Sequence, residues 1–279
     1  MKAGKYILLN EKFYLSESLM ISPFNRSFRY GDGFFETMKF AKGEIVLGDL
    51  HFERLFSSLE KMYFKKPSFL HKDFLISHIQ KLIAKNKHSG NVRIRITLFR
   101  GNGSLFDPEN LLANVLIETS PLEQDAWHKK GLVCGIYQDA KKTADQFSPI
   151  KSNNFLPYLM AAFWAKKNHL DDAILLNNFN RIADATIANV FLLKEGRVVT
   201  PSLAEGCIAG VMRKYFLGKM HECGIPVEET AIEPSDLELA TEVFLTNSIF
   251  HVRWVKQIGK NHFKNAFSHQ LWKDFNPIS

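Results

Sequence analysis

Cysteine is scarce in this chain of 279 residues, which contains three copies. They are odd in number, widely spaced, and accompanied by neither a CxxC pair nor a histidine cluster. Disulfide frameworks and zinc sites depend on paired or closely spaced ligands. We therefore expect no disulfide framework and no bound metal, and we expect Cys134, Cys207 and Cys223 to be buried as small hydrophobic residues.

Long apolar runs are also absent from the sequence. No stretch approaches the roughly 18 consecutive apolar residues of a membrane-spanning helix, and the amino-terminal MKAGKYILLNEKFYL alternates like a strand instead of resembling a signal peptide. The net charge of +7 is spread along the chain, without a recognisable nucleic-acid-binding module. We therefore expect a cytoplasmic protein with neither membrane nor nucleic-acid partners.

The apolar residues, 46% of the chain, are sufficient for a full core. In the first half, their spacing predicts a strand hairpin, a further strand, a helix with Asp49 as N-cap and a second helix, over residues 6–15, 34–40, 49–63 and 72–85. The stretch NVRIRITLFRGNG alternates strictly, so it predicts a strand with Val92, Ile94, Ile96 and Leu98 on a core face and Arg93, Arg95, Thr97 and Phe99 on a polar face.

The second half alternates predicted strands and helices. We expect strands at 132–137, 173–176 and 242–246, helices at 156–167 and 210–224, and a hairpin that joins 181–193 to 197–200. The polar run SPLEQDAWHKKG is the best candidate for a linker. The pattern predicts an α+β fold with a small N-terminal domain (1–121), a linker (122–130) and a larger C-terminal domain (131–279).

Several short segments contain residues suited to chemistry. Lys151, in SPIKSNNFLPYLMAA, follows the apolar Ile150 and precedes an apolar helix, which suggests partial burial. A desolvated lysine has a lowered pKa that leaves its amine free to attack a carbonyl. A solvated loop lysine is the ordinary alternative. Arg54 shares a helical face with His51 and is flanked by core positions, which suggests a cation that faces inward toward an anion. A surface arginine on an amphipathic helix is the ordinary alternative.

Two further segments suit a phosphate, and a third contains an isolated acid. In GCIAGVMRKYF a glycine precedes a helix, so the amides of Val211 and Met212 are available to an anion. In VFLTNSIF a strand ends in three hydrogen-bonding side chains, which serve either a phosphate or an ordinary turn. Asp184, in RIADATIANVFLL, interrupts an apolar strand and requires a cationic partner, of which a protonated ring nitrogen is one possibility.

Six segments in this order resemble the class IV aminotransferases, enzymes of fold type IV that use pyridoxal 5'-phosphate (PLP). This group includes branched-chain aminotransferases, D-amino acid aminotransferases and aminodeoxychorismate lyases. The segments are YGDGFFET, HFERL, KSNNFL, IADATIANVFL, GVMR and FLTNS, which extend from Tyr30 to Ser248. Each is weak alone, but together they cover most of the chain in the order and spacing of the family.

The resemblance implies roles for individual residues. Lys151 would form the covalent link to PLP and act as the base, and Asp184 would replace the glutamate that usually pairs with the pyridine nitrogen. The cofactor-binding residues implied are Arg54, Lys151, Asp184, Asn189, Val211, Met212, Thr246, Asn247 and Ser248. The substrate-binding residues implied are Tyr30, Phe35, Arg95 and Arg100, with the two arginines as alternative ligands of a substrate carboxylate. A homodimer is also implied, in which Tyr30 or residues 104–106 reach the partner's site.

The resemblance predicts the cofactor more sharply than the reaction. The leading hypothesis is amino transfer between an amino acid and a 2-oxo acid, with branched-chain or other apolar amino acids among the possible donors. The alternative is a lyase that releases pyruvate and aminobenzoate from aminodeoxychorismate, because ANVF, GVMR and LTNS look closer to that branch and Phe155 departs from the branched-chain pattern. A non-catalytic relative of the same fold is the third possibility, and the shorter acid at position 184 is the feature that keeps it open.

Overall fold

The computed structural model describes residues 4–107, 110–123 and 126–278. Its contacts divide the chain into two compact units. Unit 1 contains the described residues up to 123 together with Lys151–Asn154 and Ile278, and unit 2 contains most of the remaining chain. The predicted linker, 122–130, includes two positions outside the described residues, so the domain boundaries stay a prediction.

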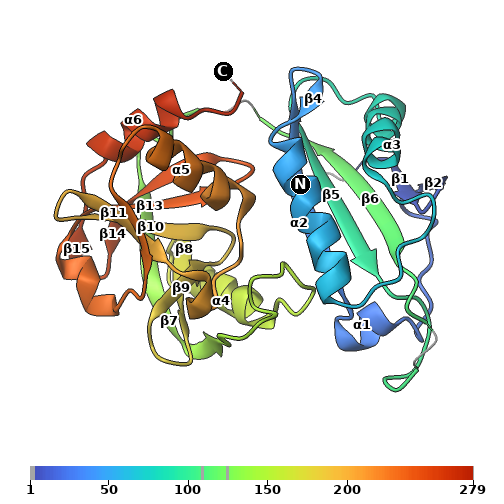
Figure 1. The fold of residues 1–279 in the computed structure, drawn as a ribbon, viewed down its shortest axis with the longest axis horizontal. Helices are drawn as coiled ribbons and strands as arrows, with labels where there is room; N and C mark the ends of the chain where they lie inside the picture. The colour runs from blue at the N-terminus through green and yellow to red at the C-terminus, as the bar shows by residue number, and fades with distance from the viewer. Residues whose placement is uncertain (1–3, 108–109, 124–125, 279) are drawn as a thin grey trace. The chain divides into compact units, whose positions relative to one another are not determined.

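Unit 1 is built on an antiparallel sheet of six strands with the order β2-β1-β6-β5-β3-β4 (Figure 1). Its elements are β1 (Tyr6–Leu9), β2 (Lys12–Leu15), α1 (Arg26–Tyr30), β3 (Gly33–Ala41), β4 (Glu44–Ile45), α2 (Gly48–Lys61), α3 (Lys72–Lys85), β5 (Val92–Phe99) and β6 (Asn114–Pro121). The predicted hairpin, strands and helices of this half are all present, whereas α1, β4 and β6 were not predicted.

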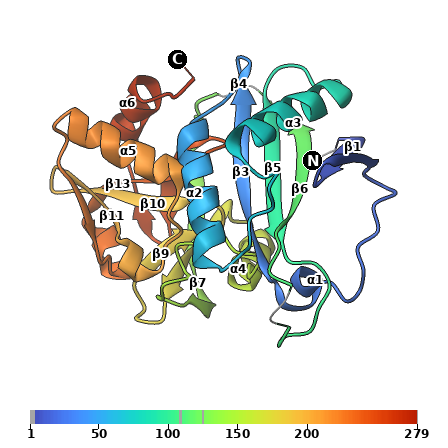
Figure 2. The same ribbon diagram turned by 45° about the vertical axis from the view of Figure 1, so that its right-hand side comes forward.

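The two faces of β5 differ as its alternation predicts. The apolar side chains at positions 92, 94, 96 and 98 are fully buried, whereas those at 93, 95 and 97 are half-buried. Phe99, which was predicted on the polar face, is buried at 8% exposure at the end of the strand. Helix α2 contacts β3, and helix α3 contacts β1 and β6 (Figure 2). The helices bury Phe52, Leu55 and Leu75 among other side chains. Each such side chain contributes about 1.5–3 kcal/mol.

The start of α2 corrects the predicted N-cap. The helix begins at Gly48, and the N-cap is Leu47 in a left-handed conformation with φ 54°. Asp49 therefore lies in the first turn, where its charge is favourable beside the free amides. Helix α3 has the predicted bounds and is capped by the side chain of His71, which accepts a hydrogen bond from the Phe74 amide.

Unit 2 contains a mixed sheet of nine strands. Eight follow the order β12-β11-β10-β13-β14-β7-β8-β9, and β15 pairs with β14. Its elements are β7 (Leu132–Lys142), α4 (Leu156–Lys167), β8 (Asp172–Asn177), β9 (Ile182–Ala185), β10 (Asn189–Lys194), β11 (Arg197–Pro201), η1 (Leu203–Glu205), α5 (Val211–Glu222), β12 (Val227–Thr230), η2 (Pro234–Glu238), β13 (Ala240–Asn247), β14 (His251–Ile258), β15 (Asn261–His262) and α6 (Ala266–Asp274).

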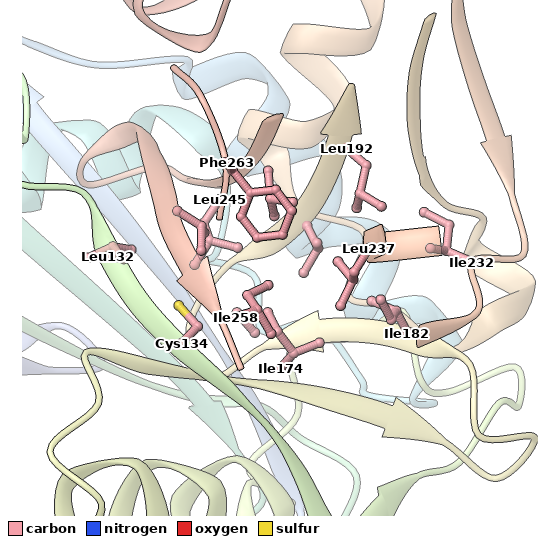
Figure 3. Packing of buried hydrophobic residues seen from close by; sticks show 14 of the residues in the cluster. Leu132, Cys134, Ile174, Ile182, Leu192, Ile232, Leu237, Leu245, Ile258 and Phe263 are labelled. Atoms are coloured by element: carbon pink, nitrogen blue, oxygen red, sulfur yellow. The ribbon is translucent and has the colours of Figure 1, made fainter. Parts of the chain in front are cut away.

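The core of unit 2 is formed by aliphatic side chains from these strands and from the segments that cross them. Figure 3 shows Ile174, Leu192 and Leu245 within this cluster, together with Leu237 of η2 and Phe263. A second cluster lies between α4 and the strands β7 and β8, and Tyr158 belongs to it. The first cluster therefore stabilises the sheet through the burial of its side chains, and the second stabilises it through the packing of α4 against β7 and β8.

The predicted strand over 181–193 is wrong in one respect, because it is divided into β9 and β10. A turn closes between them, where the Ala185 amide donates to the Ala188 carbonyl at 2.9 Å. Thr186 donates from its hydroxyl to Asp172 Oδ1 at 2.6 Å and from its amide at 3.1 Å. These bonds stop the strand, so β9 pairs with β8 whereas β10 pairs with β11 and β13.

The cysteines also differ from expectation in one case. Cys134 and Cys207 are buried, but Cys223 is exposed just after α5. All three are free thiols. Across the described residues, no helix is both long enough and apolar enough to cross a membrane.

Candidate active site

A buried cluster of one acid, one histidine and one arginine joins β3 to α2 in unit 1. Glu36 accepts from Arg54 twice, from Nε at 2.7 Å and from Nη2 at 2.7 Å, and it lies 2.8 Å from His51 Nδ1. Because residues three apart share a helical face, the positions 51 and 54 both reach the same carboxylate. The predicted inward orientation of Arg54 is thereby explained by a protein anion, Glu36, which the sequence analysis did not single out.

The electrostatics of this cluster favour one arrangement of protons. Burial alone raises the pKa of Glu36, but the charge of Arg54 and the hydrogen bonds from His51 and Arg54 outweigh it and lower the pKa from 4.5 to about 2. Burial lowers the pKa of His51 despite the neighbouring carboxylate. A neutral His51 therefore donates from Nδ1, and its buried Nε2 has no hydrogen-bond partner among the described residues.

The segment that contains Lys151 belongs to unit 1 and pairs with the start of β3. The Phe35 amide donates to the Lys151 carbonyl at 2.9 Å, and the Asn153 amide donates to the Gly33 carbonyl at 2.9 Å. A β-carbon on Gly33 would lie 2.6 Å from Asn153 Nδ2, so the close approach requires a glycine at this position. These bonds fix the backbone of Lys151, and its side chain is half-buried.

The ring of Phe35 is contacted by two cations. Arg95 lies with its guanidinium carbon 3.7 Å from the ring centroid, and Lys151 Nζ lies 4.8 Å from it. Arg95 also donates from Nε to the Thr97 hydroxyl at 3.3 Å, and burial lowers the pKa of its guanidinium. The lysine, the arginine and the aromatic ring therefore lie together, and Arg95 is on the face that the alternation of β5 predicts for it.

Arg100 lies in a different environment from Arg95. It is buried, donates from Nη1 to Asp32 Oδ1 at 2.6 Å and from Nη2 to the Met62 carbonyl at 2.6 Å, and stacks on the ring of Phe64 at 4.1 Å. These contacts tie the end of β5 to the end of α2. Tyr30, the other implied substrate residue of unit 1, ends α1 and is 37% exposed.

In unit 2, Asp184 is buried at 1% exposure and accepts four hydrogen bonds. Its Oδ2 accepts from Lys142 Nζ at 3.1 Å, from the Tyr158 hydroxyl at 2.8 Å and from the Ile208 amide at 3.0 Å. Its Oδ1 accepts from Asn189 Nδ2 at 3.0 Å. Asp184 therefore has a cationic partner of its own within this unit, and the implied cofactor residue Asn189 contacts it directly.

The N-terminus of α5 lies beside the same residues. Asn189 donates to the Ile208 carbonyl at 2.8 Å, and a β-carbon on Gly210 would collide with the Asn189 side chain. Within the described chain no side chain caps this helix, and its first turn contains no acid, so the amides of Val211 and Met212 favour an anion.

The end of β13 supplies the remaining implied residues. Thr246 stands opposite Asn189 in the strand register, and its buried hydroxyl has no hydrogen-bond partner in the described structure. Asn247 instead shapes a turn, since its Oδ1 accepts from the amides of Ile249 and Phe250. Ser248 is half-buried in that turn. A glycine-lined helix start and an unsatisfied buried hydroxyl in one unit suit the phosphate of PLP.

The structure thus places the implied residues in two sets. One set, Arg54, Lys151, Phe35 and Arg95, lies in unit 1, and the other, Asp184, Asn189, Val211, Met212 and Thr246, lies in unit 2. Neither Glu36 nor Lys142 was predicted from the sequence. The signal for Glu36 was an acid at a core-facing position of GFFETMKF, whereas Lys142 is one of a lysine pair at the end of a strand and has no distinguishing pattern. No group of metal-binding side chains was found among the residues described.

These features define a class of protein that comparison with known families confirms. Residues 33–258 match the family described as Amino-transferase class IV. An aminodeoxychorismate lyase from Vibrio harveyi is 28% identical over 247 residues, covering 87% of this chain and 89% of the relative. A putative branched-chain-amino-acid aminotransferase from Methanocaldococcus jannaschii is 27% identical, covering 87% and 84%.

Solved structures show the same fold. The branched-chain aminotransferase of Thermoproteus uzoniensis matches with a TM-score of 0.87 at 21% identity, over 98% of this chain and 94% of that chain. The chain belongs to the class IV aminotransferase family, a family of PLP-dependent enzymes. The predicted α+β fold of type IV is confirmed.

Proposed function

We propose that this protein binds PLP and transfers an amino group between an amino acid and a 2-oxo acid. The observation that carries the proposal is the candidate phosphate site of unit 2. There the uncapped start of α5, Gly210 and the Thr246 hydroxyl without a hydrogen-bond partner among the described residues lie near Asp184. The family match over most of the chain supports the same assignment. When bound, PLP supplies an aldehyde that captures amines and a ring that withdraws electrons from the substrate.

Residues of both units would bind the cofactor, and one of them would also transfer a proton. Lys151 would hold the cofactor covalently and, once displaced by the substrate amine, its Nζ would remove and return the proton of the substrate Cα. The amides of Val211 and Met212 and the Thr246 hydroxyl would hold the phosphate. Arg54, whose Nε and Nη2 are fixed by Glu36, would add a guanidinium to it.

Between the two arginines that compete for the substrate carboxylate, we favour Arg95. Arg100 is buried and already donates to a carboxylate and a carbonyl. Arg95 is half-buried on the polar face, and among the described residues it donates a hydrogen bond to the Thr97 hydroxyl. Phe35 on the same face would contact the substrate's apolar side chain, which supports an apolar amino acid as donor.

The proposal is tested by incubating purified protein with PLP, amino-acid donors and oxoglutarate. We expect a yellow protein whose visible absorbance disappears on borohydride reduction and is absent from Lys151→Ala. We also expect a new amino acid to form in the oxo-acid-dependent reaction. A colourless protein that cannot be reconstituted would overturn the enzyme interpretation and favour the non-catalytic alternative.

A lyase acting on aminodeoxychorismate is the second candidate. Two curated relatives with that name, from Vibrio harveyi and Bacillus subtilis, are 28% and 27% identical to this chain. The separate assay offers aminodeoxychorismate without any oxo acid and measures pyruvate and aminobenzoate. Their formation without amino transfer would place the lyase first, and strict dependence on the oxo acid would exclude it.

We also propose that the protein is a homodimer. Unit 1 exposes Phe24, Phe28, Leu105 and Phe106 from two neighbouring segments, and α4 of unit 2 exposes Leu156, Leu159 and Phe163 along one face. Such exposed apolar side chains are typical of interfaces. Sedimentation at micromolar concentration is expected to give twice the chain mass of 32.0 kDa, and a stable 32.0 kDa species would contradict the proposal.

A further inference from the structure

A second buried lysine, Lys142, lies beside the acid that the family assigns to the cofactor ring. Lys142 ends β7 with 6% of its surface exposed. Its Nζ lies 3.1 Å from Asp184 Oδ2, 3.5 Å from the Ser148 carbonyl oxygen, and 5.1 Å from the ring centroid of Tyr158. The proposed reaction assigns no step to this lysine.

The hydrogen bonds on Asp184 are distributed unequally between its two oxygens. Three donors, from Lys142, Tyr158 and Ile208, converge on Oδ2, whereas Asn189 alone donates to Oδ1 in the described structure. A carboxylate oxygen has about two lone-pair sites. Oδ2 is therefore saturated within the protein, and a further N–H donor would be accepted at Oδ1.

The charge of the carboxylate is also already matched. Lys142 and Asp184 form an ion pair with side chains that are 7% and 2% exposed. The other titratable groups beside Asp184 stay neutral near pH 7, because burial raises the pKa of Tyr158 well above its usual value and the pKa of Cys207 to about 12. A protonated ring nitrogen would thus be a second cation on one acid, and like charges disfavour each other.

We propose that Lys142 is a positioning residue that orients Oδ1 of the short acid Asp184 toward the ring nitrogen and limits the protonation of that nitrogen. The inference rests on the proposed binding of PLP. Asp184, which has one methylene fewer than glutamate, is held in place by four hydrogen-bond donors. Because its charge is paired with the Lys142 ammonium, it attracts a proton on the ring nitrogen less strongly. The ring then withdraws electrons less strongly than it would opposite an unpaired carboxylate.

The test uses full-length protein reconstituted with PLP that is labelled with ¹⁵N in the ring, and reads the ring-nitrogen chemical shift by NMR at pH 7. The variant Lys142→Met removes the charge at similar length, and Lys142→Arg retains it. Tyr158→Phe is the matched control, since it removes a neutral donor from the same Oδ2. We expect Lys142→Met to raise the pKa of the ring nitrogen by about one unit or more, the size of shift that a neighbouring charge produces.

The other variants should leave the signal near that of the wild type. An unchanged shift in Lys142→Met, or an equal change in Tyr158→Phe, would overturn the proposal. Where Lys142→Met does not fold, the wild-type protein still decides, because a fully protonated ring nitrogen at pH 7 is incompatible with the inference. A wild-type protein that takes up no PLP would overturn the proposed function, and this inference with it, whereas the other negative results would overturn the inference alone.

Discussion

The acid–histidine–arginine cluster of unit 1 gives a quantitative prediction about stability. The substitution Glu36→Gln keeps the shape of the side chain but removes the negative charge opposite Arg54. Holding the pKa of Glu36 at about 2 instead of 4.5, at about 1.4 kcal/mol per pKa unit, corresponds to about 3 kcal/mol. We therefore expect unit 1 of the variant to be less stable by about 3 kcal/mol at pH 7.

The sign of the pH dependence follows from the direction of the shift. Because the folded-state pKa of Glu36 is lowered, its stabilisation is fully present above about pH 4.5 and is lost as the pH falls toward about 2. The difference in stability between wild type and Glu36→Gln should accordingly be largest at neutral pH and disappear near pH 2. Glu60→Gln, at an exposed position of α2, the helix that contains Arg54, is the control and should change little.

The assay must report on unit 1 by itself. All four tryptophans, at positions 127, 164, 254 and 272, belong to unit 2, so intrinsic tryptophan fluorescence does not follow the cluster directly. Hydrogen exchange of peptides from β3 and α2, compared between variant and wild type at each pH, measures local opening. Equal protection at pH 7, or a difference that persists unchanged to pH 2, would refute the reasoning.

Three further outcomes follow from the geometry. Gly210→Ala should weaken the binding of PLP by at least about tenfold, equivalent to about 1.4 kcal/mol, because the added methyl group would displace the Asn189 side chain. Equilibrium dialysis measures the affinity for PLP, and an unchanged affinity would contradict this prediction. Arg95→Met should raise KM for the amino donor with little loss of stability. Arg100→Met should instead lower the melting temperature, because it removes a buried ion pair. A raised KM in Arg100→Met together with a lowered melting temperature in Arg95→Met would exchange their proposed roles. A bulky thiol reagent should label Cys223 alone in the folded protein, since the other two cysteines are buried, and mass spectrometry of the labelled chain decides.

The elements that the sequence predicts well are those with strong periodic patterns. Helices α3 and α4 have the expected bounds, and the two faces of β5 follow its alternation. Helix α6 was not predicted because it is short and lacks a side-chain cap among the described residues. Strand β14 was also not predicted. It begins at His251, whose φ of 59° is left-handed, and no local sequence pattern predicts that conformation.

The site was predicted from short motifs, each of which is continuous in sequence, whereas its supporting contacts were not predicted. Lys151 and Asp184 were recognised from short segments that follow the family order. By contrast, Lys142 is 42 positions from its partner Asp184, and Glu36 is 18 positions from Arg54. Such pairings depend on strand order and helix packing, so they become visible only in three dimensions.

Each unit pairs a buried acid of the candidate site with a cation from the same unit. In unit 1 the buried acid Glu36 is paired with Arg54, and in unit 2 the buried acid Asp184 is paired with Lys142. A buried acid without such a partner would be costly in the cofactor-free protein. Because both acids are paired and hydrogen-bonded beforehand, binding an anionic phosphate or a ring nitrogen would require little rearrangement of either cluster, and less of the binding free energy would be lost in ordering side chains. Glu36→Gln and Lys142→Met therefore perturb two separate preorganised clusters, and their effects on stability should add.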